Sequence, residues 1–254
     1  MLIDSHAHLQ WRSFGQDREK VINLAKEADV KYIVNIGYDL EGSKKAIELA
    51  EKYEGLYATV GIHPHNASEL NEDILDSLRQ LSESPKVVAI GEIGLDYYRN
   101  LSPKAVQQKA FEAQLILAQE LKLPVVIHDR EAHVDVLSTL SKFEGKLKGV
   151  MHCFSGSLEM AEQYVKMNYY ISFAGPVTFP NAYELHESAK LIDLNNILLE
   201  TDCPWLAPQK MRGKRNEPAF LLFTAEKIAN LRGISLAELA EATTKNAKRI
   251  YQIP

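Results

Sequence analysis

The sequence contains only two cysteines, no long apolar run and no excess of positive charge. Cys153 and Cys203 are too few for a disulfide scaffold, and we interpret both as small buried hydrophobic residues in a reducing cytoplasm. No apolar stretch reaches the roughly 20 residues of a membrane-spanning helix. The first residues also lack the basic flank and apolar core of a secretory signal. We therefore expect a cytoplasmic protein that does not associate with membranes.

The charge balance excludes a globally basic surface. The chain of 254 residues carries 29 lysines and arginines against 34 aspartates and glutamates, a formal net charge of -5. A protein with this balance has no overall positive field that would attract nucleic acid. Any polyanionic substrate must therefore be bound by metal ions and by local groups of cationic side chains.

Short apolar segments alternate with helical patterns along the whole chain. Eight segments rich in Val, Ile and Leu predict buried strands at residues 2–4, 32–36, 57–61, 87–91, 124–127, 149–151, 169–173 and 197–200. The helical patterns between them include a helix starting at Ser102 and Pro103 and a last helix capped by Ser235 and Glu238. This alternation predicts a parallel sheet. The length matches the roughly 250 residues of an eightfold barrel, so we expect one α/β domain over residues 1–254, a (β/α)8 TIM barrel.

Candidate metal ligands lie near the downstream ends of the apolar segments. They are His6, His8, Glu92, His128, His152 and Asp202. In a parallel barrel the C-terminal ends of all strands meet at one face, where the connecting loops build the active site. Ligands that are far apart in the sequence would meet there. An open doubly wound sheet is the alternative, but it would not gather ligands from so many strands.

The ligand types indicate a centre for divalent metal ions. His6 and His8 are two residues apart on a strand, so both imidazoles point to the same face and can bind one ion. Glu92 lies between Gly91 and Gly94, and taken alone it would more often be a strand-end carboxylate or a helix cap. Four imidazoles and two carboxylates exceed the four ligands of one zinc ion, so the set predicts two cations that share a carboxylate. Imidazole ligands favour zinc, manganese or nickel over magnesium.

The sequence resembles the TatD-type metal-dependent deoxyribonucleases of the amidohydrolase-like barrel superfamily. The resemblance rests on the motifs DSHAHL, GIHPH, GEIGLDYY, VIHDR, HCFSG and LETDCPWLAP, which span essentially the whole chain. It implies two divalent cations (Mg²⁺, Mn²⁺ or Zn²⁺), with magnesium able to support activity. One would be held by His6, His8, Glu92 and Asp202, and the other by Glu92, His128 and His152. It also implies a 3′ to 5′ exonuclease that acts on single-stranded DNA.

Two carboxylates are assigned catalytic roles. Glu92 would bridge the two cations, which together can activate a water for in-line attack on phosphorus. Asp202 lies beside this bridge and is the expected general base. Glu200 is two residues earlier on the same strand and so on the same face, where it either takes part in catalysis or hydrogen-bonds a histidine ligand.

Further side chains are candidates for substrate binding. His63 ends the third strand without a place in the metal count, so we expect it to contact a substrate phosphate. Arg130 follows His128 by two residues and is a phosphate contact unless a surface ion pair explains it. The loop after the last strand would neutralise the phosphates of a single strand, although a run of charge is often only a solvated face. Its cationic residues are Lys210, Arg212, Lys214 and Arg215.

Three functions are compatible with these residues. The first is a metal-dependent deoxyribonuclease that hydrolyses phosphodiester bonds of single-stranded DNA from the 3′ end. The second is a hydrolase of small esters, amides or lactones on the same dinuclear site, which would be indifferent to the loss of Lys210, Arg212, Lys214 and Arg215. The third is a catalytically silent barrel that binds a partner. The residues alone leave the metal and the oligomeric state open, and a monomer is compatible with them.

Overall fold

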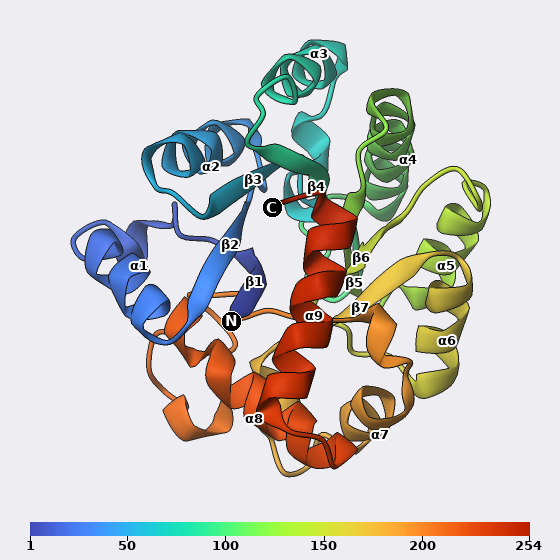
Figure 1. Cartoon of the computed structure of the whole chain (residues 1–254). Helices are drawn as coiled ribbons and strands as arrows, with labels where there is room; N and C mark the ends of the chain where they lie inside the picture. The colour runs from blue at the N-terminus through green and yellow to red at the C-terminus, as the bar shows by residue number, and fades with distance from the viewer.

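Eight parallel strands form one sheet in the order in which they occur in the chain (Figure 1). A computed structural model describes residues 1–254. The strands are β1 (Leu2–Ala7), β2 (Val30–Ile36), β3 (Leu56–Val60), β4 (Val87–Asp96), β5 (Val125–Arg130), β6 (Gly149–Met151), β7 (Tyr169–Phe173) and β8 (Ile197–Leu199). A parallel bridge between Ala7 and Cys203 joins the chain after β8 to β1 and nearly closes the sheet. The predicted eightfold barrel is confirmed.

The helices surround the barrel. They are α1 (Arg18–Glu27), α2 (Leu40–Lys52), α3 (Glu72–Leu81), α4 (Lys104–Leu121), α5 (His133–Ser141), α6 (Leu158–Lys166), α7 (Tyr183–Leu191), α8 (Leu221–Arg232) and α9 (Leu236–Tyr251). Short 3₁₀ helices lie in the connections: η1 (Arg12–Phe14), η2 (Pro64–Glu69), η3 (Gly175–Thr178), η4 (Leu194–Asn196), η5 (Gln209–Met211) and η6 (Pro218–Phe220). No helix is both long enough and apolar enough to cross a membrane.

The apolar core has two layers, because successive side chains of a strand point to opposite faces of the sheet. On β5, Val125 and Ile127 belong to a cluster of 51 buried residues that includes the inner faces of the helices. Val126, between them, belongs to a cluster of 13 that combines strand residues with Ile250 and Tyr251 of α9. The smaller cluster fills the inside of the barrel.

Helix α9 closes the N-terminal end of the barrel. In Figure 1 this helix, drawn in red, crosses in front of the strands. The Tyr251 hydroxyl donates to the carbonyl of Ser5 at 3.1 Å, and Thr244 Oγ1 donates to the carbonyl of Met1 at 3.1 Å. Both acceptors lie at the beginning of the chain. The opposite end of the barrel, where the strands finish, is therefore the open one.

Two local features differ from the sequence-based expectation. Strand β4 does not end at residue 91 but continues to Asp96, because it pairs with β5 as far as Arg130. The helix expected to start at Ser102 and Pro103 begins at Lys104, and Ser102 Oγ instead donates to the carbonyl of His65 at 3.0 Å. The capping box expected at the start of the last helix is confirmed.

Candidate metal centre

Strand alternation directs candidate ligands to the open end of the barrel. On β5, Val126 faces the barrel interior, and His128 lies two residues further on, in the same strand. Val150 of β6 and His152 just after it have the same relation. Because the strands are parallel and period two keeps such residues on one face, both imidazoles emerge at the mouth of the barrel, away from α9.

One group of ligand atoms surrounds Oε2 of Glu92. The Nε2 atoms of His6 and His8 lie 3.4 Å and 3.7 Å from it, and 3.1 Å from each other. Oδ1 of Asp202 is 3.5 Å from the His6 nitrogen and 3.4 Å from the His8 nitrogen. Four ligands at the zinc distances of about 2.0–2.1 Å would be about 3.3 Å apart in a tetrahedron. These atoms therefore fit a cation between them.

A second group surrounds the other oxygen of the same carboxylate. Oε1 of Glu92 lies 2.7 Å from His128 Nδ1, 3.0 Å from His152 Nε2 and 3.4 Å from His63 Nε2. His152 also faces the first group, since its ring stacks on that of His6 with centroids 3.8 Å apart. Glu92 thus presents one oxygen to each of two histidine groups, as a carboxylate shared by two ions would.

Buried hydrogen bonds orient the histidine rings. Nδ1 of His152 lies 3.0 Å from Oε1 of Glu200, which also accepts from the backbone N–H of Cys153 at 2.7 Å. Nδ1 of His8 lies 3.1 Å from the carbonyl oxygen of Ile36. In each ring this leaves Nε2 facing Glu92 or Asp202, and such support of the distal nitrogen is typical of metal-binding histidines.

Asp96 supports the second group from the side opposite Glu92. Its Oδ2 atom lies 2.8 Å from His65 Nε2 and 3.2 Å from His128 Nε2. His128 therefore lies between the carboxylates of Glu92 and Asp96. Burial by itself would raise the pKa of Asp96, but the hydrogen bonds from His128 and His65 outweigh it and hold the pKa far below its usual value.

The charged groups keep one another ionised despite their burial. Burial would raise the pKa of Glu92, yet the positive charge of His152 and the hydrogen bonds from His128 and His152 outweigh it and leave the pKa well below normal. Burial would likewise raise the pKa of Asp202, but the hydrogen bond with His8 and the charge of His6 lower it. Burial lowers the pKa of His63 to about 4 despite Glu92, so this ring is neutral near pH 7, and its Nδ1 accepts a hydrogen bond from the backbone N–H of His65 at 3.1 Å.

The ligand atoms lie at the bottom of a cavity of ≈ 930 Å³ that we call the metal cavity. Its wall includes Arg99, Arg130 and Trp205, in addition to most of the candidate ligands. The Arg130 guanidinium lies 4.1 Å from the ring centroid of Tyr98, whose side chain is exposed. Arg130 was expected to contact phosphate, and this position at the wall is compatible with that role.

The cationic side chains of the loop after β8 lie outside the wall of the metal cavity. Lys210 is 3.6 Å from Glu226 and lies over the ring of Phe223. Arg212 lies over the ring of Phe179, with its guanidinium carbon 5.6 Å from the centroid. Arg215 donates to both carboxylate oxygens of Asp17 at 2.9 Å and 2.7 Å and thus ties the loop to the start of α1. The structure does not bring Lys210 or Arg212 to the candidate ligands.

Residues between β1 and α2 that were not among the candidates from the sequence lie beside the metal cavity. Trp11 and Tyr38 are part of its wall, and Arg12 and Arg18 are close to Trp11 in a neighbouring cavity. One signal was available in the sequence: an aromatic residue and two arginines follow the His-x-His ligand pair within ten residues.

Comparisons with known proteins agree with this geometry. A family model described as TatD related DNase matches residues 3–252. The chain is 46% identical to the uncharacterized metal-dependent hydrolase YabD of Bacillus subtilis, with 100% of both chains covered. It is 41% identical to the 3′-5′ ssDNA/RNA exonuclease TatD of Erwinia tasmaniensis, covering 99% of this chain and 100% of the relative. The crystal structure of the TatD homolog YjjV from Escherichia coli K12 superposes with a TM-score of 0.95 at 32% identity, covering 100% of this chain and 98% of that one.

Proposed function

The chain belongs to the family of TatD-related DNases, and from this we propose that it removes nucleotides one by one from the 3′ end of single-stranded DNA. As a TatD-family metal-dependent hydrolase it needs a site for metal. The observation that carries the proposal is Glu92, whose two oxygens face two different groups of histidines. We propose that each group holds one divalent cation, with His6, His8 and Asp202 on one side of Glu92 and His63, His128 and His152 on the other.

Two cations in these positions would neutralise charge on a phosphate and make a water acidic enough to react near neutral pH. The protein's own groups then have separate tasks. Asp202, ionised and with 13% of its side chain exposed to the metal cavity, accepts the proton of the attacking water. Glu92 is only 4% exposed and remains an acceptor throughout, since its lowered pKa keeps it charged. Glu200 holds the ring of His152 in place rather than meeting the substrate, because it is fully buried.

A phosphodiester substrate is supported by the charges at the mouth of the metal cavity. Arg99 and Arg130 are part of its wall and can bind phosphate oxygens. A hydrolase of small neutral esters would use the same ligands but would gain nothing from these arginines. The relative from Erwinia tasmaniensis, named as an exonuclease for single-stranded DNA and RNA, supports the same substrate class.

The test is digestion of a 5′-labelled single-stranded oligonucleotide by protein stripped of metal, with Mg²⁺, Mn²⁺ or Zn²⁺ added back. We expect a ladder of labelled products that shortens with time and only with metal. Glu92→Ala should abolish it, whereas Glu162→Ala, which removes an exposed carboxylate of α6, should not. Early release of a labelled mononucleotide would instead indicate attack from the 5′ end, and absence of cleavage with every metal would refute the nuclease. Digestion of an RNA oligonucleotide of the same sequence measures whether the enzyme prefers DNA or RNA.

A further inference from the structure

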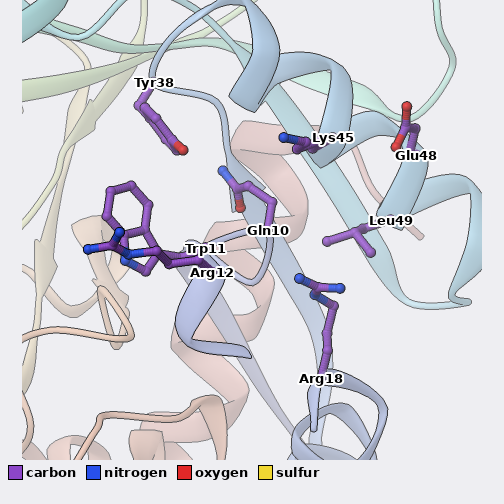
Figure 2. Close-up of a pocket in the computed structure, with 8 residues that line it drawn as sticks. All are labelled: Gln10, Trp11, Arg12, Arg18, Tyr38, Lys45, Glu48 and Leu49. Carbon is purple, nitrogen blue, oxygen red and sulfur yellow. The ribbon is translucent and has the colours of Figure 1, made fainter. Parts of the chain in front are cut away.

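A second cavity, of ≈ 680 Å³, adjoins the metal cavity between the loop after β1 and helix α2 (Figure 2). We call it the side cavity. Trp11 and Tyr38 are part of the wall of both cavities, and their ring centroids are 5.5 Å apart. The ring of the candidate ligand His8 lies 5.9 Å from that of Tyr38. A single layer of aromatic side chains therefore separates the side cavity from the candidate metal ligands.

Positive charge dominates the side cavity. Arg12, Arg18 and Lys45 line it, against the single carboxylate of Glu48. In Figure 2 the Arg18 guanidinium, the Lys45 ammonium and the Tyr38 hydroxyl point toward the space around Gln10, and Glu48 lies at its margin. Such an excess stands out in a protein whose net charge is -5.

These cations are largely free to bind an anion. Arg18 uses its Nε–H to donate to the carbonyl of Leu9 at 2.7 Å and forms no ion pair, so its terminal nitrogens are available. Arg12 forms no ion pair either, and its side chain is exposed. Lys45 lies 3.0 Å from Glu41 in an exposed pair on the same helix, a kind of contact that competes only weakly with a ligand.

A buried acceptor provides a second and independent sign of a ligand. Gln10 lines the side cavity and is only 8% exposed. Its Nε2 donates to the carbonyl of Ile36 at 2.6 Å, whereas its Oε1 is buried and accepts no hydrogen bond. Unpaired buried acceptors are rare in folded proteins, so a donor from a ligand is expected nearby. Nucleotides carry such donors on their bases and sugars.

We propose that the side cavity binds the part of a single strand that continues from the scissile bond. Arg18 and Lys45 hold the next phosphate on the 5′ side of the scissile one, and a base stacks on Trp11. Aromatic faces combined with a cationic groove are the usual means of holding single strands without reading their sequence. The assignment rests on the proposed nuclease function. An enzyme that removes one nucleotide from a 3′ end has the whole remaining strand on the 5′ side, so the side cavity receives that side.

The test compares a single-stranded oligonucleotide with the p-nitrophenyl ester of thymidine 5′-monophosphate, whose one phosphodiester reaches only the metal cavity. For Arg18→Gln combined with Lys45→Gln we expect the KM for the oligonucleotide to rise about 10-fold, with kcat within about twofold. The slope of log KM against log salt should fall by about 0.7, because the double variant loses its contact with one phosphate of a single strand. The ester should show no comparable rise in KM.

Controls keep the outcomes distinct. Lys44→Gln removes the neighbouring exposed charge of α2, which does not line the side cavity, and should leave the KM for the oligonucleotide near that of the unmodified protein. Lys45→Gln is also measured alone, because Arg18 additionally holds the Leu9 carbonyl and its loss can disturb the loop. An unchanged KM in the double variant, or an equal rise in Lys44→Gln, overturns the proposal. If the unmodified protein hydrolyses the ester but not the oligonucleotide, it is the nuclease function itself that fails.

Discussion

Oε1 of Glu200 lies 3.0 Å from Nδ1 of His152, and both side chains are buried at the open end of the barrel. The contact holds the ring so that its Nε2 faces Glu92 at 3.0 Å. A carboxylate in this position makes the imidazole a stronger ligand, because it stabilises the ring N–H on the far side.

Replacing this carboxylate should weaken metal binding without unfolding the protein. For Glu200→Gln we expect the affinity for Mn²⁺ or Zn²⁺ to fall about 10- to 100-fold, since the amide still accepts a hydrogen bond but carries no charge. Titration calorimetry on protein stripped of metal measures this. Glu162→Gln, an exposed change of the same chemistry on α6, is the control. Equal affinities of the two variants would mean that Glu200 does not support a metal ligand.

The proposed general base can be tested by an isosteric change. Asp202→Asn should lower kcat by about 10²-fold or more, because the amide cannot accept the proton of the attacking water. The backbone of Asp202 has a positive φ of 53°, which asparagine adopts readily, so the fold should be retained. The rate is measured at saturating metal, so that a weaker ligand is not mistaken for a lost base. Near-normal turnover under these conditions would remove Asp202 from the proton transfer.

Metal removal should destabilise the folded protein. An ion at 100 times its Kd adds about 2.7 kcal/mol to the free energy of unfolding. For a chain of this size that corresponds to a rise in Tm of roughly 5–10 °C. The ion does this by neutralising Glu92 and Asp202. These two carboxylates lie 3.4 Å and 3.5 Å from the same nitrogen, Nε2 of His6. Differential scanning fluorimetry with and without chelator measures the shift, and Glu92→Ala should lose most of it. The same shift in that variant would place the ions elsewhere.

Cations in the wall of the metal cavity should matter more than those of the loop after β8. Arg130 is part of the wall, so Arg130→Gln should raise the KM for an oligonucleotide about 10- to 100-fold, as expected for one charged hydrogen bond. Lys210 and Arg212 lie against aromatic rings outside it, so their joint change to Gln should raise the KM less than about twofold. A larger effect of the loop variant than of Arg130→Gln would show that the strand crosses the loop.

Much of the fold, and the meeting of the candidate ligands at one end of the barrel, could be predicted from the sequence for a simple reason. Alternation along a strand relates each ligand to an apolar residue two positions earlier, as for Val126 and His128, and parallel strands bring such ends together. The resulting barrel required no knowledge of distances between strands. It followed from the number and spacing of apolar segments alone.

Contacts between elements could not be predicted in this way. His63 was expected to bind substrate, which stays a prediction, and nothing in the sequence indicates that its Nε2 lies 3.4 Å from Oε1 of Glu92. The position of Glu92 depends on how far β4 extends past residue 91, and the apolar pattern does not show this. Arg215 belongs to a run of cationic residues, yet its partner Asp17 is 198 residues away in the chain. Local charge patterns contain no information about such a partner.

That ion pair predicts a specific dependence of stability on pH. The hydrogen bonds from Arg215 lower the pKa of Asp17, so the pair stabilises the fold above the unfolded-state pKa of about 3.9 and loses this effect as the pH falls through the lower folded-state value. We expect Arg215→Gln to lower the free energy of unfolding by about 1 kcal/mol at pH 7, and the difference from the unmodified protein to shrink below about pH 4. Thermal unfolding across this pH range measures it. Lys214→Gln, an exposed change in the same loop without an ion pair, should have no such dependence. A loss in Arg215→Gln that is constant with pH would mean that the arginine acts instead through its hydrogen bond to the carbonyl of Ser13 or through packing on Phe14.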